Sequence, residues 1–183
     1  MKVFLDFEAS SLSDHSYPIE VAWVFQDGRS ESHLIAPAPS WTDWDPAAEA
    51  VHGIDRDVLT RDGTPHEVVA RRMVAVLAGH ELFASAPSWD GKWMSYLLRS
   101  SGIPRHSLRL RDTDDALRES CAEILRPALP PHRVDTLLPD IIASATAAKA
   151  DQPAHRALAD AMGEYETWAR ALRAARDLIA DTA

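Results

Sequence analysis

Two acidic residues, Asp6 and Glu8, interrupt the apolar N-terminal segment VFLDFEAS, which otherwise has the composition of a buried strand. In a strand, side chains two positions apart project to the same face, so these carboxylates would lie side by side. Such a pair repels itself and resists burial unless something compensates its charge. Two interpretations follow: a frayed strand with both acids in water, or a site for divalent cations bound by oxygen ligands.

Asp90 and Asp160 are two further acids to consider. Asp90 follows a short apolar segment and is expected in the first turn of a helix, where the helix dipole favours an acid even without a function. Asp160 lies in PAHRALADAMG, an unusually apolar setting for an acid on a helix. Taken alone, Asp90 is explained by the helix dipole, whereas the setting of Asp160 is not that of an ordinary surface acid.

His155 precedes Asp160 by five residues, a spacing that corresponds to a rotation of about 140° on an α-helix. On one helix, the two side chains would therefore not share a face. Pro153 indicates where the helix begins, because proline is favoured in the first turn of a helix. A helix that begins at Pro153 would leave His155 in its first turn or just outside it, free to lean over the site that Asp160 faces.

The elements that would position these residues follow the order of an α/β fold. Apolar alternation predicts strands over residues 2–7, 17–26, 32–36, 81–85 and 108–110. Helical spacing of apolar residues predicts helices over residues 46–53, 68–77, 89–100, 113–125 and 154–180. The first three strands are expected to form an antiparallel meander.

The chain has 183 residues, of which 46% are hydrophobic and 26% charged, and this composition fits a single globular domain over residues 1–183. Its one cysteine, Cys121, excludes an intramolecular disulfide and a cysteine-rich zinc site. No apolar run approaches the roughly 20 residues of a membrane span, and no targeting segment is evident. We therefore expect a cytoplasmic protein without a membrane partner.

The net charge of −9 is unevenly distributed. Residues 1–67 hold 4 basic and 13 acidic side chains, whereas residues 68–183 hold 15 of each. Within the second part, residues 91–133 carry 8 basic and 5 acidic side chains, a net of +3. This strip is a candidate surface for phosphate groups, although an ordinary solvated face also explains it.

Three segments, FLDFEASSLS, SAPSWDGKWMSYLL and HRALADA, resemble the three exonuclease motifs of the DEDDh family of 3′→5′ exonucleases. That family includes polymerase proofreading subunits, ribonuclease T and oligoribonuclease. The order and spacing agree, and PIEVAWV, AAEAVHGI and RDTDDAL resemble further segments, so the similarity spans roughly residues 1–170. The resemblance implies the α/β class and a ribonuclease H-like fold, a three-layer α/β/α sandwich with a central mixed sheet.

The resemblance also implies roles for five residues. Asp6, Glu8, Asp90 and Asp160 would bind two divalent cations, Mg²⁺ or Mn²⁺, and His155 would act as the general base. Two cations about 3.5 to 4 Å apart can hold the attacking water and the leaving oxygen of one phosphodiester. Histidine suits the base because the pKa of an imidazole ordinarily lies near neutrality. The implied substrate is the 3′ end of single-stranded DNA or RNA.

Two departures from the family pattern concern the substrate. The family usually has Thr-Gly after its first motif, and this chain has Ala9, Ser10 and Ser11 where contacts with the terminal nucleotide are predicted. The second motif commonly reads His-Asn-x-x-Phe-Asp, whereas this chain reads SAPSWD up to Asp90. All five catalytic positions are retained, which favours an active enzyme over a silenced relative.

Other residues are candidates for substrate contacts or for packing. Arg156, beside the predicted base, could contact phosphate or be an exposed helix arginine. Trp41 and Trp44 lie in a proline-containing loop and are candidates for base stacking. His52, before Gly53, is interpreted as a structural turn residue, with a place beside the site as the alternative. The remaining tryptophans on apolar faces are predicted to pack in the core: Trp23, Trp89 and Trp93.

Three functions remain open on the sequence alone. The first is a metal-dependent 3′→5′ exonuclease acting on single-stranded ends. The second is a catalytically weak module that binds nucleic acid as an accessory to a polymerase or repair complex. The third is a phosphodiesterase for a small nucleotide. The C-terminal helix could support a homodimer or simply pack within the chain.

Overall fold

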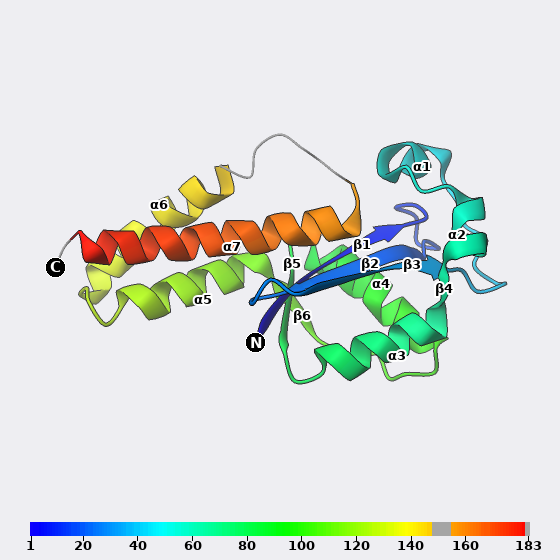
Figure 1. The fold of residues 1–183 in the computed structure, drawn as a ribbon, viewed down its shortest axis with the longest axis horizontal. Helices are drawn as coiled ribbons and strands as arrows, with labels where there is room; N and C mark the ends of the chain where they lie inside the picture. Colours follow the sequence, from blue (N-terminus) through cyan, green and yellow to red (C-terminus); the bar gives the residue numbers. More distant parts are fainter. Residues whose placement is uncertain (148–154, 182–183) are drawn as a thin grey trace.

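The computed structural model describes residues 1–147 and 155–181 of the chain. The strands form one six-stranded sheet in the order β4-β3-β2-β1-β5-β6 (Figure 1). They are β1 (Lys2–Ala9), β2 (Pro18–Phe25), β3 (Ser30–Ala36), β4 (Thr64–Pro65), β5 (Glu81–Ala84) and β6 (Leu110–Asp112). The first three pair antiparallel, while β5 pairs parallel with β1 and β6 parallel with β5, so the predicted meander and mixed sheet are confirmed.

The helices cover both faces of this sheet. They are α1 (Pro46–His52), α2 (Arg56–Asp62), α3 (His66–Leu77), α4 (Pro87–Ser100), α5 (Thr113–Leu125), α6 (Pro131–Ala147) and α7 (Ala157–Ala180). In Figure 1, α3 and α4 lie on one side of the sheet and α5 and α7 on the other, which is the predicted three-layer sandwich. None of these helices is long and apolar enough to cross a membrane.

The central strand β1 directs its side chains into two different layers. Its odd-numbered residues from Val3 to Phe7 are buried in the cluster that α3 and α4 form with the sheet. Phe4 points the other way, and its ring centroid lies 5.6 Å from that of Trp168 on α7. Because alternate side chains face opposite sides, Asp6 and Glu8 share the face of Phe4, which α7 covers.

The long helix α7 is anchored beyond the edge of the sheet. Its C-terminal half contributes Ala171, Leu172 and Ala175 to a second apolar cluster shared with α5 and α6. Nearer the sheet, the Trp168 indole N–H donates a hydrogen bond to Ser120 Oγ on α5 at 3.0 Å. This packing holds the helix axis in place, so that its N-terminal turn lies over β1.

The structure differs from the sequence-based expectation at several elements. The sequence analysis assigns no helix to the proline-containing segment after α5, yet α6 begins at Pro131 and contains Pro139. Proline is tolerated in a first helical turn, where its missing N–H has no partner to lose. The helices α2 and α6 and the short strand β4 were not predicted. Helix α7 begins at Ala157 rather than near Pro153, which lies outside the described residues.

Gly63, between α2 and β4, allows a close backbone approach that a larger residue would prevent. A Cβ atom there would lie 2.3 Å from the Leu59 carbonyl oxygen and 2.6 Å from the Ala36 amide nitrogen. We expect Gly63→Ala to lower the free energy of unfolding in urea by about 1–3 kcal/mol, because backbone atoms cannot yield. Gly91→Ala, on α4 with no atom within 4 Å of the new Cβ, is the control and should be neutral or stabilising. Equal stability of the two variants would contradict this explanation.

Candidate metal centre

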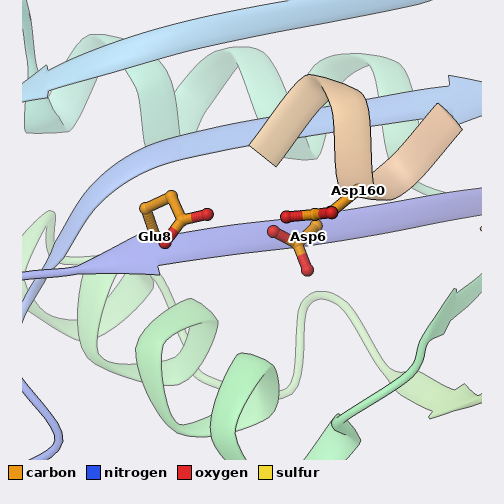
Figure 2. Close-up of side chains that lie close together, drawn as sticks. All are labelled: Asp6, Glu8 and Asp160. Carbon is orange, nitrogen blue, oxygen red and sulfur yellow. The ribbon is translucent and has the colours of Figure 1, made fainter. Parts of the chain in front are cut away.

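Three carboxylates converge where the first turn of α7 meets β1. Figure 2 shows Asp6 and Glu8 on the strand and Asp160 on the helix directed toward one another. One carboxylate oxygen from each residue lies within 4.8 Å of those of the other two. The frayed-strand interpretation of the first two acids is therefore wrong, since β1 continues through both to Ala9.

Asp90 joins this centre from α4, on the other side of β1. Its carboxyl is buried, and its Oδ1 accepts the backbone N–H of Phe7 at 3.1 Å. Phe7 lies between the two acids of the strand, so this hydrogen bond ties the start of α4 to the centre. The negative charge of Asp90 reaches Asp6, whose pKa it helps to raise. Among the described residues, Asp90 stands outside the 4.8 Å group formed by the other three acids.

Burial and mutual repulsion dominate the electrostatics of the centre. Burial, with the charges of Asp90, Glu8 and other acids, raises the pKa of Asp6 to about 9. Burial and the charge of Asp160 raise the pKa of Glu8 to about 7. Burial also raises the pKa of Asp90 to about 7, although the N–H groups bonded to its carboxyl oppose that rise. Hard divalent cations bind such oxygen groups and would reverse these shifts, so the donor set fits Mg²⁺ or Mn²⁺.

Glu164 is an additional buried acid that no sequence motif indicated. It lies one helical turn after Asp160 on α7, and its charge contributes to the raised pKa values of Asp6 and Asp90. Residues four apart lie on the same face of a helix. That spacing is the one sequence signal that could have identified Glu164, once Asp160 was placed at the centre.

A pocket of about 440 Å³ adjoins the carboxylates. Glu8 and His155 line it on the side of the centre, and its remaining wall is mainly apolar, with contributions from Leu12, Val51 and Trp93. His155 lies two residues before α7, outside the helix, as the sequence analysis anticipated from helical geometry. The predicted general base and a predicted metal ligand thus line the same pocket.

His52 is the structural turn residue that was predicted, and it also lines this pocket. Its Nδ1 accepts the backbone N–H of Ile54 at 3.0 Å, just after the left-handed Gly53 that ends α1. The N–H bond of a neutral ring is then on Nε2, which is buried and has no hydrogen-bond partner among the described residues. Burial lowers the pKa of His52, which keeps the ring neutral.

The segment after β1 is held by hydrogen bonds within the chain. Ser10 and Ser11 are buried, and both donate to Asp43 Oδ2, at 3.2 and 2.5 Å. Ser13 donates to Asp43 Oδ1 at 3.0 Å. The serine hydroxyls are thus engaged by the protein, while Ala9 and Ser11 line the pocket. Their contact with a terminal nucleotide stays a prediction.

The burial of Trp41 and Trp89 differs from the sequence-based prediction. Trp41 is only 4% exposed and packs on Tyr17, so it cannot serve as a stacking surface. Trp44 is half-buried, and its indole N–H donates to Glu49 at 2.6 Å. Trp89 was expected in the core but is 38% exposed, in the first turn of α4. The sequence signal that sets Trp89 apart is its position immediately before Asp90, an acid of one of the motifs.

Arg156, the remaining predicted substrate contact, forms an ion pair within the chain. Its guanidinium donates to both carboxylate oxygens of Glu20 on β2, at 3.0 and 2.8 Å. The side chain of Arg156 is still half-exposed, so its contact with phosphate stays a prediction. Within the described residues, its guanidinium is engaged by the carboxylate of Glu20.

The sequence matches no protein-family model and no curated protein. Solved structures do match: the zinc-bound complex of E. coli exonuclease I with single-stranded DNA has a TM-score of 0.67 and 16% identity, over 99% of this chain and 42% of that chain. The complex of E. coli exonuclease I with a dA16 oligonucleotide has a TM-score of 0.67 and 17% identity, with the same coverage of both chains. A product-bound exonuclease I has a TM-score of 0.64 and 16% identity, over 99% of this chain and 45% of that chain. This chain therefore has the ribonuclease H-like fold of these structures and spans less than half their length.

The raised pKa of Asp6 makes the stability of the metal-free protein depend on pH. Its value of about 9 lies above the ordinary 3.8, so between these values the folded state holds a proton that the unfolded state releases. The free energy of unfolding in EDTA should consequently fall as the pH rises from about 4 to about 9. Asp6→Asn should flatten this slope and raise the melting temperature at pH 8, by about 2–4 °C per kcal/mol relieved.

The control for this measurement is Asp140→Asn, which removes an exposed acid on α6. Asp140→Asn should leave the dependence of the free energy of unfolding on pH the same as in the parent. Mn²⁺ should raise the melting temperature of the parent by mass action, and far less that of Asp6→Asn. A parent stability that is independent of pH over this range would contradict the assignment of Asp6.

Proposed function

We propose that this chain is a metal-dependent 3′→5′ exonuclease that hydrolyses phosphodiester bonds at the 3′ end of single-stranded nucleic acid. The observation that carries the proposal is the convergence of Asp6, Glu8 and Asp160 beside a pocket that His155 also lines. Carboxylates gathered in a partly buried space are compensated either by protons or by a cation, and a cation that binds them has a pocket beside Glu8. The bound single-stranded DNA in the matched exonuclease I complexes supports the class of substrate.

Asp6, Glu8, Asp90 and Asp160 would hold two divalent cations. When bound, such cations neutralise the charge that develops on a phosphodiester and favour ionisation of water. The protein residues orient these ligands: Phe7 N–H fixes the carboxyl of Asp90, and β1 presents its two acids on one face. This arrangement keeps the ligand oxygens close together before any substrate arrives.

His155 is the group that would accept the proton of the attacking water. It lies on the border between the pocket and Glu8, where the phosphodiester next to a bound terminal nucleotide would be placed. An imidazole can accept a proton only while it is neutral, so activity should fall at acidic pH. The mainly apolar wall of the pocket, with Leu12 and Val51, would take the base of that nucleotide.

Trp89 would support the next part of the strand. Its ring centroid is 5.6 Å from that of Trp93, which forms part of the pocket wall, and Lys92 Nζ lies 4.9 Å from the Trp89 centroid. The two indoles thus extend from the pocket to the surface. Exposed aromatic rings stack on nucleobases irrespective of sequence, which suits an enzyme that shortens strands of any composition.

The catalytic assignment is tested with a 5′-labelled single strand and Mn²⁺. The parent should give products that shorten progressively from the 3′ end, and EDTA should stop the reaction. Asp160→Asn should abolish cleavage through loss of a metal ligand, and His155→Ala should lower kcat by about 100-fold to 10,000-fold through loss of the base. Exposed His106 provides the control, since His106→Ala should cleave as the parent does.

The same assay separates the alternative functions. Retention of the strand without metal-dependent cleavage would instead indicate a binding module. Cleavage of a dinucleotide but not of a long strand would indicate a small-nucleotide phosphodiesterase. Full activity of Asp160→Asn would remove the metal centre from the mechanism.

The role of Trp89 predicts an effect on substrate binding more than on chemistry. Trp89→Ala should raise KM for a long single strand by about 5-fold to 150-fold, corresponding to a loss of about 1–3 kcal/mol for one stacked base. Trp89→Phe retains a ring and should recover most of the affinity. The change in kcat should be small in both variants. An unaltered KM in Trp89→Ala would show that the strand leaves the pocket by another route.

A further inference from the structure

Glu20 on β2 is a buried acid that lies directly opposite Glu8 in the antiparallel ladder. Opposed residues of paired strands project to the same face, and two like charges in this arrangement destabilise the pair. Glu20 has 3% of its side chain exposed, so water does little to screen that repulsion. A positive group must compensate the two acids for the sheet to hold them side by side.

Arg156 supplies that positive charge. Its Nε lies 3.0 Å from Glu20 Oε2 and its Nη2 lies 2.8 Å from Glu20 Oε1, so the guanidinium engages both oxygens in parallel. Its charge also reaches Glu8, where it opposes the rise in pKa that burial and Glu20 produce. The ion pair is thus directly coupled to one of the carboxylates of the metal centre.

Glu20 also fixes the beginning of α7. The backbone N–H of Ala157, the first residue of that helix, donates to Glu20 Oε2 at 3.0 Å. The first amides of a helix lack partners within it, and the N-cap residue Arg156 provides no side-chain hydrogen bond to them. A carboxylate of β2 therefore caps α7, and the cap lies three residues before Asp160.

His155, immediately before Arg156, has a backbone φ of 43° and is the one described non-glycine residue with a positive φ. This left-handed conformation is unfavourable for a residue with a side chain, and it persists only where neighbouring contacts hold it. The contacts that act on the next two residues are the ones from Glu20. These contacts fix the chain immediately after His155.

We propose that Glu20 and Arg156 are positioning residues that act through His155. Their ion pair and the Ala157 hydrogen bond hold the predicted base in place at the pocket, next to Glu8. This inference rests on the proposed function, because it assigns His155 the task of accepting a proton. It assigns both residues a role that is exerted through His155 and not as ligands of a cation.

A double-mutant cycle tests the proposal by measuring kcat and KM with a single strand and saturating Mn²⁺. Glu20→Gln should lower kcat by about 10-fold to 100-fold with little change in KM, the range expected when a catalytic group is displaced by about 1 Å. In the His155→Ala background, the same substitution should change kcat less than about 3-fold, because the group it positions is gone. Arg156→Lys keeps the charge but loses the paired geometry and should give an intermediate kcat.

Glu31→Gln is the matched control, because Arg72 engages both oxygens of Glu31 at 2.9 and 2.6 Å far from the centre, between α3 and β3. It should leave kcat and KM unchanged. Amide hydrogen exchange provides a second readout, in which Ala157 N–H should lose protection in Glu20→Gln but not in Glu31→Gln. Thermal melting establishes that each variant is folded, and Arg156→Lys serves if Glu20→Gln is not.

The outcomes distinguish a failure of the proposed function from a failure of the positioning role. Normal turnover in His155→Ala would overturn the proposed function. Impaired turnover in His155→Ala together with normal turnover in Glu20→Gln and Arg156→Lys would overturn only the positioning role. An equal loss from Glu20→Gln with and without His155 would show that Glu20 acts elsewhere, and would also overturn it.

Discussion

Carboxylates repel one another most strongly where water is scarce, and this repulsion governs the space between β1, α4 and α7. Burial and neighbouring acids raise the pKa of Asp6 to about 9, far above its ordinary value. The same causes raise the pKa of Glu8 to about 7. A chain that gathers these groups must either keep them protonated or provide positive charge nearby. Divalent cations would provide it at the centre, and Arg156 provides it at the margin, beside Glu20.

The rest of the fold can tolerate this unfavourable cluster because its apolar packing lies elsewhere. The odd-numbered residues of β1 face the core under α3 and α4, so the even-numbered positions are available for polar groups on the opposite face. Helix α7 is held at its far end by the apolar cluster with α5 and α6. Its first turn is held over the sheet by this distant apolar packing together with the contacts that Glu20 makes to Arg156 and Ala157. The apolar packing of α7 and the carboxylate that it contributes to the candidate metal centre thus lie at different ends of the same helix.

The pocket and the carboxylate cluster share Glu8, and His155 also lines the pocket. On one side lie apolar walls suited to a nucleobase, and on the other lie oxygen ligands suited to cations. The loop that follows β1 forms part of this wall, and Asp43 holds it through three serine hydroxyls. A phosphodiester seated beside Glu8 would thus meet both environments at once, which is the requirement for cleavage next to a terminal nucleotide.

The sequence by itself determined the features that depend on local periodicity. The strand period of two places Asp6 and Glu8 on one face, and a spacing of five excludes His155 from the helical face of Asp160. Pairings between distant segments required the tertiary structure, because no local pattern encodes them: Glu20 and Arg156 are 136 residues apart in the chain. The exposure of Trp89 depends on how α4 packs, and the burial of Trp41 depends on how the loop before α1 packs. Sequence alone does not indicate which neighbour will cover an apolar residue.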